Sequence, residues 1–151
     1  MEIDTKKLGE KLPSWAIKEH PTKTNMTVIH PMAVVDRLNE VFGIGQWNTR
    51  LEYIKSYQWT QKTKKGDREV FTACSKTVLD VPKHGIHLEQ FGGSTNDDEG
   101  DAMKGSATDG LTKIASYLGI GAEIYKGHGN INGGDEQGEE INNNRVSGSR
   151  L

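Results

Sequence analysis

The spacing of apolar side chains predicts two amphipathic helices, one in the first third of the chain and one near residue 110. The first begins at Pro31, whose missing N–H costs nothing in the first turn of a helix, and it ends at Gly43. Its apolar face consists of Val34, Val35, Leu38, Val41 and Phe42. The second helix runs from about Asp101, an acid suited to the positive end of the helix dipole, to Leu118. Its apolar stripe consists of Met103, Ala107, Leu111, Ile114, Ala115 and Leu118.

Between these helices the pattern changes to the two-residue period of β-strands. A first strand is predicted over 47–59, with an apolar face that we expect to be covered, formed by Trp47, Leu51, Tyr53, Tyr57 and Trp59. The polar stretch QKTKKGDR predicts a hairpin tip with its turn at Gly66–Asp67, followed by strands over 69–81 and 86–91. A polar loop over 94–100 leads into the second helix. The predicted fold is an α+β domain: a helix, a three-stranded antiparallel meander and a helix.

The predicted strands are long for so small a domain. Strands of a dozen or more residues exceed the usual five or six. This length indicates a sheet that is shared between neighbouring copies of the chain in an oligomer.

Composition divides the chain into a body and a tail. The 151 residues suit one domain, and 19 basic and 21 acidic residues give a net charge of −2. Residues 127–151 are rich in Gly and Asn, carry four of the acids and two arginines, and leave 17 charges of each sign in residues 1–126. Because the tail has almost no large apolar side chain to bury, we expect it to be disordered and the folded domain to span 1–126.

Several classes of protein are disfavoured by what the sequence lacks. No apolar run approaches the 18 or more residues of a membrane span, and the first residues have no apolar core of a signal peptide. The single cysteine, Cys74, excludes an internal disulfide. We therefore expect a cytoplasmic protein without membrane contact.

No arrangement of residues stands out as catalytic. The Gly-Ile-Gly segments at 43–45 and 119–121 each follow a helix and lack the lysine of a phosphate-binding loop. We expect no cofactor and no enzymatic activity. One alternative stays open: Asp97, Asp98 and Asp101 as ligands of a small metal-dependent nuclease.

Three groups of residues favour nucleic-acid binding. The predicted hairpin tip carries four cations that could meet phosphates, Lys62, Lys64, Lys65 and Arg68. On the second helix, Lys113 lies opposite the apolar stripe and is expected to face out of the core, while Lys104 lies nearer the edge of the stripe and is expected to be partly structural. Near the N-terminus an aromatic residue is mixed with basic ones, in the set Trp15, Lys18, His20 and Lys23. For Trp15 itself, core packing is the favoured interpretation.

Two segments resemble the Rad52-like single-strand annealing family. Residues 36–47, DRLNEVFGIGQW, are similar to its helix-to-strand pattern Asn-Glu-x-Phe-Gly-x-x-x-Trp. Residues 101–113, DAMKGSATDGLTK, are similar to its later helix pattern Ala-x-Lys-x-Ala-x-Thr-Asp-(Gly/Ala)-Leu-Lys-(Lys/Arg). Both motifs occur in the family's order, with a strand meander between them, and short members such as phage proteins of the Sak type and bacterial DdrA-like proteins share these features.

The resemblance implies a β-β-β-α module that assembles into rings or helical arcs and anneals single-stranded DNA without ATP, in homologous recombination or double-strand break repair. Carried over position by position, Lys113 matches a basic position in the family's inner DNA groove, Lys104 matches the helix lysine, and Lys18 lies where the family has a groove arginine. Thr108 and Asp109 are expected to fix helix packing. Two basic positions of the family are occupied here by Thr112 and Ser116.

The resemblance leaves the exact role open. One alternative is protection of DNA 3′ ends without annealing. The implied partners are single-stranded DNA and further copies of the chain, and an exonuclease or a host single-strand-binding protein are additional candidates. The implied setting is a bacterial or phage-infected cell.

Overall fold

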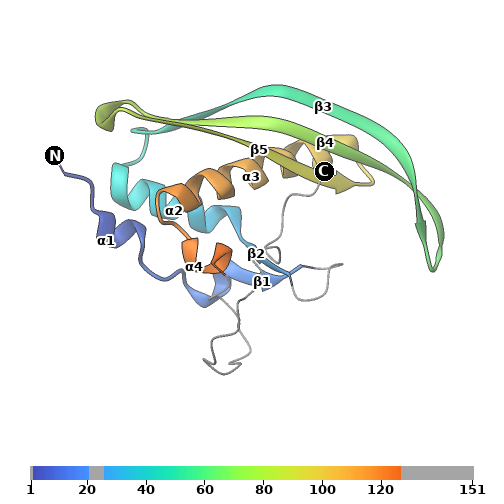
Figure 1. The fold of residues 1–151 in the computed structure, drawn as a ribbon, viewed down its shortest axis with the longest axis horizontal. Coiled ribbons are helices and arrows are strands. Elements are labelled where there is room, and N and C mark those ends of the chain that lie inside the picture. The colour runs from blue at the N-terminus through green and yellow to red at the C-terminus, as the bar shows by residue number, and fades with distance from the viewer. Residues whose placement is uncertain (1, 21–25, 127–151) are drawn as a thin grey trace.

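A sheet of long strands lies over a layer of helices in the computed structural model, which describes residues 2–20 and 26–126 (Figure 1). Helices α1 to α4 span Thr5–Leu8, Pro31–Phe42, Glu99–Tyr117 and Ala122–Tyr125, and two short 3-10 helices span Ser14–Ala16 and Pro82–His84. Strands β1 to β5 span Ile17–Glu19, Thr27–Ile29, Asn48–Thr63, Gly66–Val81 and Ile86–Asn96. The predicted tail, 127–151, and Lys23 lie outside the described residues.

The large sheet has two very different faces. Its strands run in the antiparallel order β3-β4-β5, and α3 packs along the inner face. The remaining helices and the small β1–β2 sheet lie beyond α3, so the convex outer face is covered by no other described element (Figure 1). The predicted α+β fold with a three-stranded antiparallel meander is confirmed, and the β1–β2 pair is an addition that the sequence pattern did not indicate.

Both strands of the β3–β4 hairpin are longer than predicted. Thr63 pairs with Gly66, so the turn consists of Lys64 and Lys65, and the Thr63 hydroxyl donates to the Gly66 carbonyl over 2.6 Å. The predicted turn at Gly66–Asp67 is therefore wrong, because these two residues begin β4. The third strand also continues beyond its predicted end, as far as Asn96.

A β-bulge interrupts β3 near its middle. Glu52 pairs with Lys76 and Lys55 pairs with Cys74, so that two residues of β3 lie opposite a single residue of β4. The first of the two, Tyr53, has φ of 55°, a left-handed conformation that is uncommon outside glycine. The extra residue reverses the alternation of side chains along the rest of the strand.

The bulge makes the predicted covered face of β3 wrong. Before the bulge, Leu51 pairs with Thr77, whose hydroxyl donates to a carbonyl of α3, so both lie on the inner face. After the bulge, Tyr57 pairs with Thr72 and lies on the outer face with Trp59, whose indole N–H donates to the Thr72 hydroxyl. Tyr53, Tyr57 and Trp59, which the period-two pattern placed against a core, are therefore exposed, whereas Trp47 at the start of the pattern does pack against the core.

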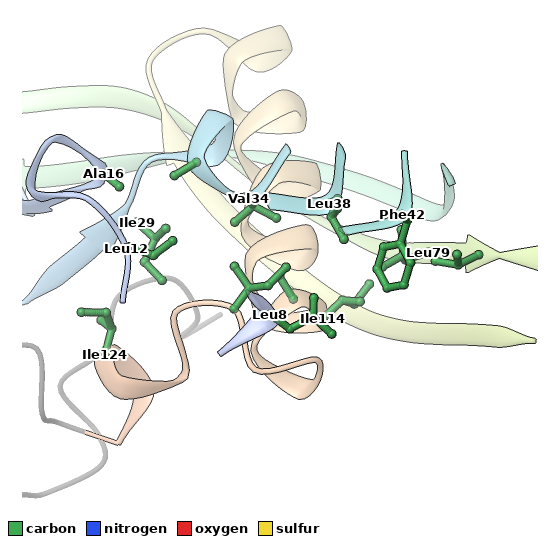
Figure 2. Close-up of a cluster of buried hydrophobic side chains, with 14 residues drawn as sticks. Leu8, Leu12, Ala16, Ile29, Val34, Leu38, Phe42, Leu79, Ile114 and Ile124 are labelled. Carbon is green, nitrogen blue, oxygen red and sulfur yellow. The ribbon is translucent and has the colours of Figure 1, made fainter. Parts of the chain in front are cut away.

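The hydrophobic core lies beneath the inner face, where α2 meets α3 and the N-terminal segment (Figure 2). The predicted α2 is confirmed; its N-cap is His30, whose Nδ1 accepts from the Met32 N–H. Its side chains Val34, Leu38 and Phe42 enter the core. The other buried members of the cluster are Leu8, Leu12, Ala16, Ile29, Ala33, Leu79, Val81, Ile114, Ala115, Ile120 and Ile124.

A buried arginine attaches the N-terminal segment to α2. The guanidinium Nη1 of Arg37 donates to the carbonyls of Lys7 and Glu10 over 2.8 and 2.7 Å, and to the buried carbonyl of Leu8 over 3.3 Å. The Lys7 carbonyl also accepts the Glu10 N–H over 3.2 Å, and Arg37 adds a charged donor to it and to its neighbours at the end of α1. The arginine therefore holds α1 in place while its own charge is hydrogen-bonded in the interior.

The backbone of α3 lies directly on the sheet. A Cβ atom on Gly92 of β5 would lie 2.1 Å from the Ser106 carbonyl and 2.4 Å from the Gly110 nitrogen. Beside this contact the hydroxyls of Ser75 and Ser106 are buried and hydrogen-bonded to each other at 2.8 Å. Small residues at this contact are a steric requirement, which explains why a long helix tolerates an internal glycine at 110.

We expect Gly92→Ala to destabilise the protein by about 1–3 kcal/mol or more, because the methyl group has no space without a shift of α3. Gly9→Ala is the control, since a Cβ there comes no nearer than 3.6 Å to the Thr5 carbonyl. Denaturant unfolding of both variants measures the difference. A Gly92 variant as stable as the Gly9 variant would contradict the close helix–sheet contact.

Candidate nucleic-acid interface

The β3–β4 hairpin projects beyond the rest of the sheet and carries four exposed cations. The last pair between β4 and β5 joins Phe71 to Asn96, so the hairpin residues beyond it pair only with each other. The cations are Lys62, Lys64, Lys65 and Arg68, and all are exposed. Lys62 pairs with Asp67 and therefore lies on the face opposite Arg68. The cations thus surround the end of the hairpin instead of lining one side.

The structure places Lys113 differently from the sequence prediction. Its ammonium is 3.0 Å from the Asp109 carboxylate, and its side chain is only 15% exposed. The same carboxylate accepts the Gly93 N–H at 2.9 Å, so Lys113 lies beside β5. The expectation that this lysine faces freely out of the core is wrong. The expectation that Asp109 fixes helix packing agrees with its bond to β5.

The second lysine of α3 is also placed differently. Lys104 is 83% exposed, and its only contact among the described ion pairs is with Asp101, at 3.9 Å. The expectation that it is partly structural is wrong, because a surface pair of this kind contributes little stability. Its ammonium is accessible to a ligand.

The N-terminal candidates lie on the small β1–β2 sheet. Lys18 is exposed on β1 and pairs with Val28. Trp15 lies just before β1, is 54% exposed and makes an edge contact with the His30 ring at 5.8 Å between centroids. The favoured interpretation of Trp15 as a core residue is wrong. Hairpin, α3 and β1 are thus three separate locations for the candidate cations (Figure 1).

Residues of both family-like motifs have packing roles. The Trp47 indole N–H donates to the Asn39 side-chain carbonyl over 2.8 Å, which joins the end of α2 to the start of β3. In the second motif Asp109 bonds β5, and Gly110 allows α3 to approach the sheet. The residues of these two motifs therefore hold the helices against the sheet.

The outer face of the sheet carries exposed aromatic side chains that the sequence analysis missed as a surface. They are Tyr53, Tyr57, Trp59 and Phe91. The sequence analysis assigned Tyr53, Tyr57 and Trp59 to a covered face, because a two-residue pattern does not reveal a bulge. Lys55 lies among the odd-numbered residues that the pattern assigned to the covered face of β3. Because a lysine is unsuited to a core, this residue indicated that the face is exposed.

The other half of the outer face is a closed ring of alternating charges. Six contacts of 2.5 to 3.5 Å connect Arg50, Glu52, Lys76, Glu89, His87 and Asp80, with Asp80 returning to Arg50. Val78 pairs with Arg50 and Glu89 at the centre of the ring and is fully buried beneath it. The ring therefore covers an apolar side chain on a face that no other described element covers.

Five pKa values in the ring are shifted toward the charged forms, and those of His87 and Asp80 have a common main cause. The hydrogen bond with Asp80, and to a smaller extent the one with Glu89, raises the pKa of His87 above 6.5. The same bond with His87 is the main cause that lowers the pKa of Asp80 below 3.8. The ring favours a protonated His87, which gives three charges of each sign.

The described ranges hold neither a metal-binding cluster nor a membrane-spanning helix. Within residues 2–20 and 26–126, no group of three or more His, Cys, Asp or Glu side chains is placed to hold a metal ion. Asp98, one of the three candidate metal ligands, instead caps α3, where its Oδ1 accepts the Asp101 N–H at 2.8 Å. No helix in the same ranges is long and apolar enough to cross a membrane.

The long meander backed by α3, with exposed cations on a projecting hairpin, agrees with the class of nucleic-acid-binding α+β proteins. Residues 3–142 match the model of the Rad52/22 family of double-strand break repair proteins, and the chain belongs to that family. This confirms the resemblance found in the two motifs and indicates a role in DNA double-strand break repair and recombination. A search of curated proteins finds no match.

The charge ring predicts a pH dependence. Because the pKa of His87 is raised, its contribution to stability is complete below pH 6.5 and is lost as the pH rises through the raised value. Because the pKa of Asp80 is lowered, its contribution is complete above pH 3.8 and is lost as the pH falls through the lowered value. The free-energy difference between the native protein and His87→Gln is therefore expected to be largest between these two limits.

An NMR titration tests the cause directly. We expect the pKa of His87 to lie above 6.5 and to fall toward that value in Asp80→Asn. Glu89→Gln should produce a smaller fall, because Glu89 is the weaker of the two hydrogen-bond partners. A His87 that titrates at 6.5 in the native protein would contradict the closed ring.

Proposed function

We propose that this protein binds single-stranded DNA and anneals complementary strands without ATP. The observation that carries the proposal is the projecting hairpin of four exposed cations, Lys62, Lys64, Lys65 and Arg68, in a chain of a double-strand break repair family. Each cation that neutralises a phosphate releases bound counterions, which favours binding of any DNA sequence. Lys18 and Lys104 are accessible for further phosphate contacts.

Annealing by this mechanism requires no catalytic group. A strand held in an extended form has already lost much of its conformational freedom, and base pairing then supplies the driving force. Lys113 has a more limited part in this proposal. Its ammonium is ion-paired with Asp109, so a phosphate there would have to share or displace the carboxylate.

The proposal includes assembly of several copies into a ring or helical arc. In a single chain the outer edges of β3 and β5 are not paired with another strand of the described sheet, and these strands are 16 and 11 residues long. Long free edges can pair with another chain. Assembly would also multiply a few weak phosphate contacts per copy into tight binding.

Loss of the hairpin cations is expected to weaken DNA binding and its salt dependence. For a single strand, each lost phosphate contact lowers the slope of log K against log salt by about 0.7. We expect Lys64→Ala/Lys65→Ala and Lys18→Ala to lose slope in proportion to the contacts removed. Lys6→Ala, an exposed lysine on α1, is the matched control. Equal slopes in all variants, measured with a fluorescent dT oligonucleotide, would refute the assigned cations.

Annealing of two complementary fluorescent oligonucleotides, without ATP or magnesium, tests the function as a whole. We expect faster annealing together with a particle mass well above that of one 151-residue chain, measured in the same samples. Binding without faster annealing would contradict the proposal and favour protection of DNA ends. Absence of binding at low salt would exclude both.

A further inference from the structure

The part of the outer face nearest the hairpin turn combines aromatic rings with cations. This distal outer face extends from the Lys55–Cys74–Gly93 pairing toward the turn, and its main side chains are Lys55, Tyr57, Trp59, Arg68, Thr72 and Thr95. We infer that it is a contact surface on which bases of single-stranded DNA stack, separate from the phosphate contacts proposed for the hairpin tip. This inference rests on the proposed function and adds a base-binding surface to it.

Two aromatic side chains of this face are exposed and lie close together on one strand. Tyr57 and Trp59 are 59% and 38% exposed, although both are large side chains with apolar area to bury. They lie two residues apart on the same face of β3, which separates them by about 6.7 Å. That is about twice the 3.4 Å rise per nucleotide of one DNA strand, so the two side chains lie within reach of nearby bases of the same strand.

The polar atom of Trp59 is already satisfied within the sheet. Its indole N–H donates to the Thr72 hydroxyl over 2.8 Å, and that hydroxyl is 2.8 Å from the Thr95 hydroxyl. This chain of hydrogen bonds crosses all three strands and restrains the ring. A restrained ring loses little freedom when a base stacks on it, so the ring surface is prepared for binding.

The charge of the distal outer face indicates which kind of partner binds it. Among the described strand residues, the distal outer face carries the cations Lys55 and Arg68 and no Asp or Glu. The acids of the hairpin, Asp67 and Glu69, alternate onto the inner face, where Glu69 is hydrogen-bonded to Thr60. In the charge ring, by contrast, every cation has an acidic partner. A surface of rings and unopposed cations is complementary to a chain of bases and phosphates.

A second copy of the protein is the competing occupant. If two copies met through this same face in a two-fold dimer, a surface carrying Lys55 and Arg68 would meet an identical surface, with no Asp or Glu among the described strand residues of either side. Like charges brought together in this way oppose association. The observations therefore favour single-stranded DNA.

The test compares paired substitutions that keep or remove the rings. The Tyr57→Phe/Trp59→Phe protein keeps two rings, whereas Tyr57→Leu/Trp59→Leu keeps apolar volume without a ring. Each protein is titrated with a dT oligonucleotide and with an abasic oligonucleotide of equal length, which has the same phosphates and no bases. We expect the Leu protein to lose about tenfold or more in affinity for dT and nothing for the abasic strand, while the Phe protein retains most of its dT affinity.

Tryptophan fluorescence gives a second measurement that does not depend on the Leu protein folding. We expect dT, and not the abasic strand, to quench the native protein, and most of this quenching to disappear in Trp59→Phe. Persistence of the full quenching in that variant would overturn the inference.

Other outcomes separate the inference from the function on which it rests. If the native protein binds and anneals DNA while the Leu protein keeps its dT affinity and particle mass, the stacking surface is wrong and the proposed function stands. If the Leu protein changes its particle mass and keeps its dT affinity, the face is covered by a second copy. If the native protein binds neither oligonucleotide, the proposed function fails as well.

Discussion

The direct contact between the backbone of α3 and the sheet determines much of this structure. Where Gly92 meets Ser106 and Gly110, no side chain separates helix from strand. The inner face can therefore hold only small residues at that level, and the hydroxyl of Ser75 is buried in a hydrogen bond to α3. Tyr57 and Trp59 instead lie on the outer face, where the bulge directs them.

The bulge in β3 is the second constraint, because one extra residue in the strand decides which of the following side chains lie on the outer face of the sheet. Up to Glu52 the outer residues of β3 belong to the charge ring, and from Lys55 onward they belong to the aromatic half. Without the extra residue, Tyr57 and Trp59 would point toward α3, and polar neighbours such as Ser56 would point outward. Ser56 instead reaches inward, where its hydroxyl donates to Glu99 over 2.7 Å.

The sequence predicted what depends on local spacing and missed what depends on distant partners. The helix from Pro31 and the order of the three strands were predictable, because apolar periodicity and turn residues mark them directly. The bulge, the turn at Lys64–Lys65 and the ion pair of Lys113 were not, because each is set by pairing across strands or between helix and strand. Trp15 was misplaced for the same reason: its exposure depends on how β1 folds against His30.

The motifs that identify the family consist mainly of residues that pack the helices against the sheet. They therefore identify the family without showing where DNA binds. Asn39 bonds Trp47 across the junction between α2 and β3, and Asp109 bonds the edge of β5. Such residues preserve the arrangement of helix and sheet whatever the surface carries. Between these scaffold residues and the hairpin the roles differ, since Thr112 is buried and the Ser116 hydroxyl donates to the Lys113 carbonyl over 2.6 Å, so neither side chain adds to the exposed surface charge. In this chain four exposed cations gather at the end of the projecting hairpin, beside the exposed rings of Tyr57 and Trp59, so phosphates and bases would be held by neighbouring parts of one sheet.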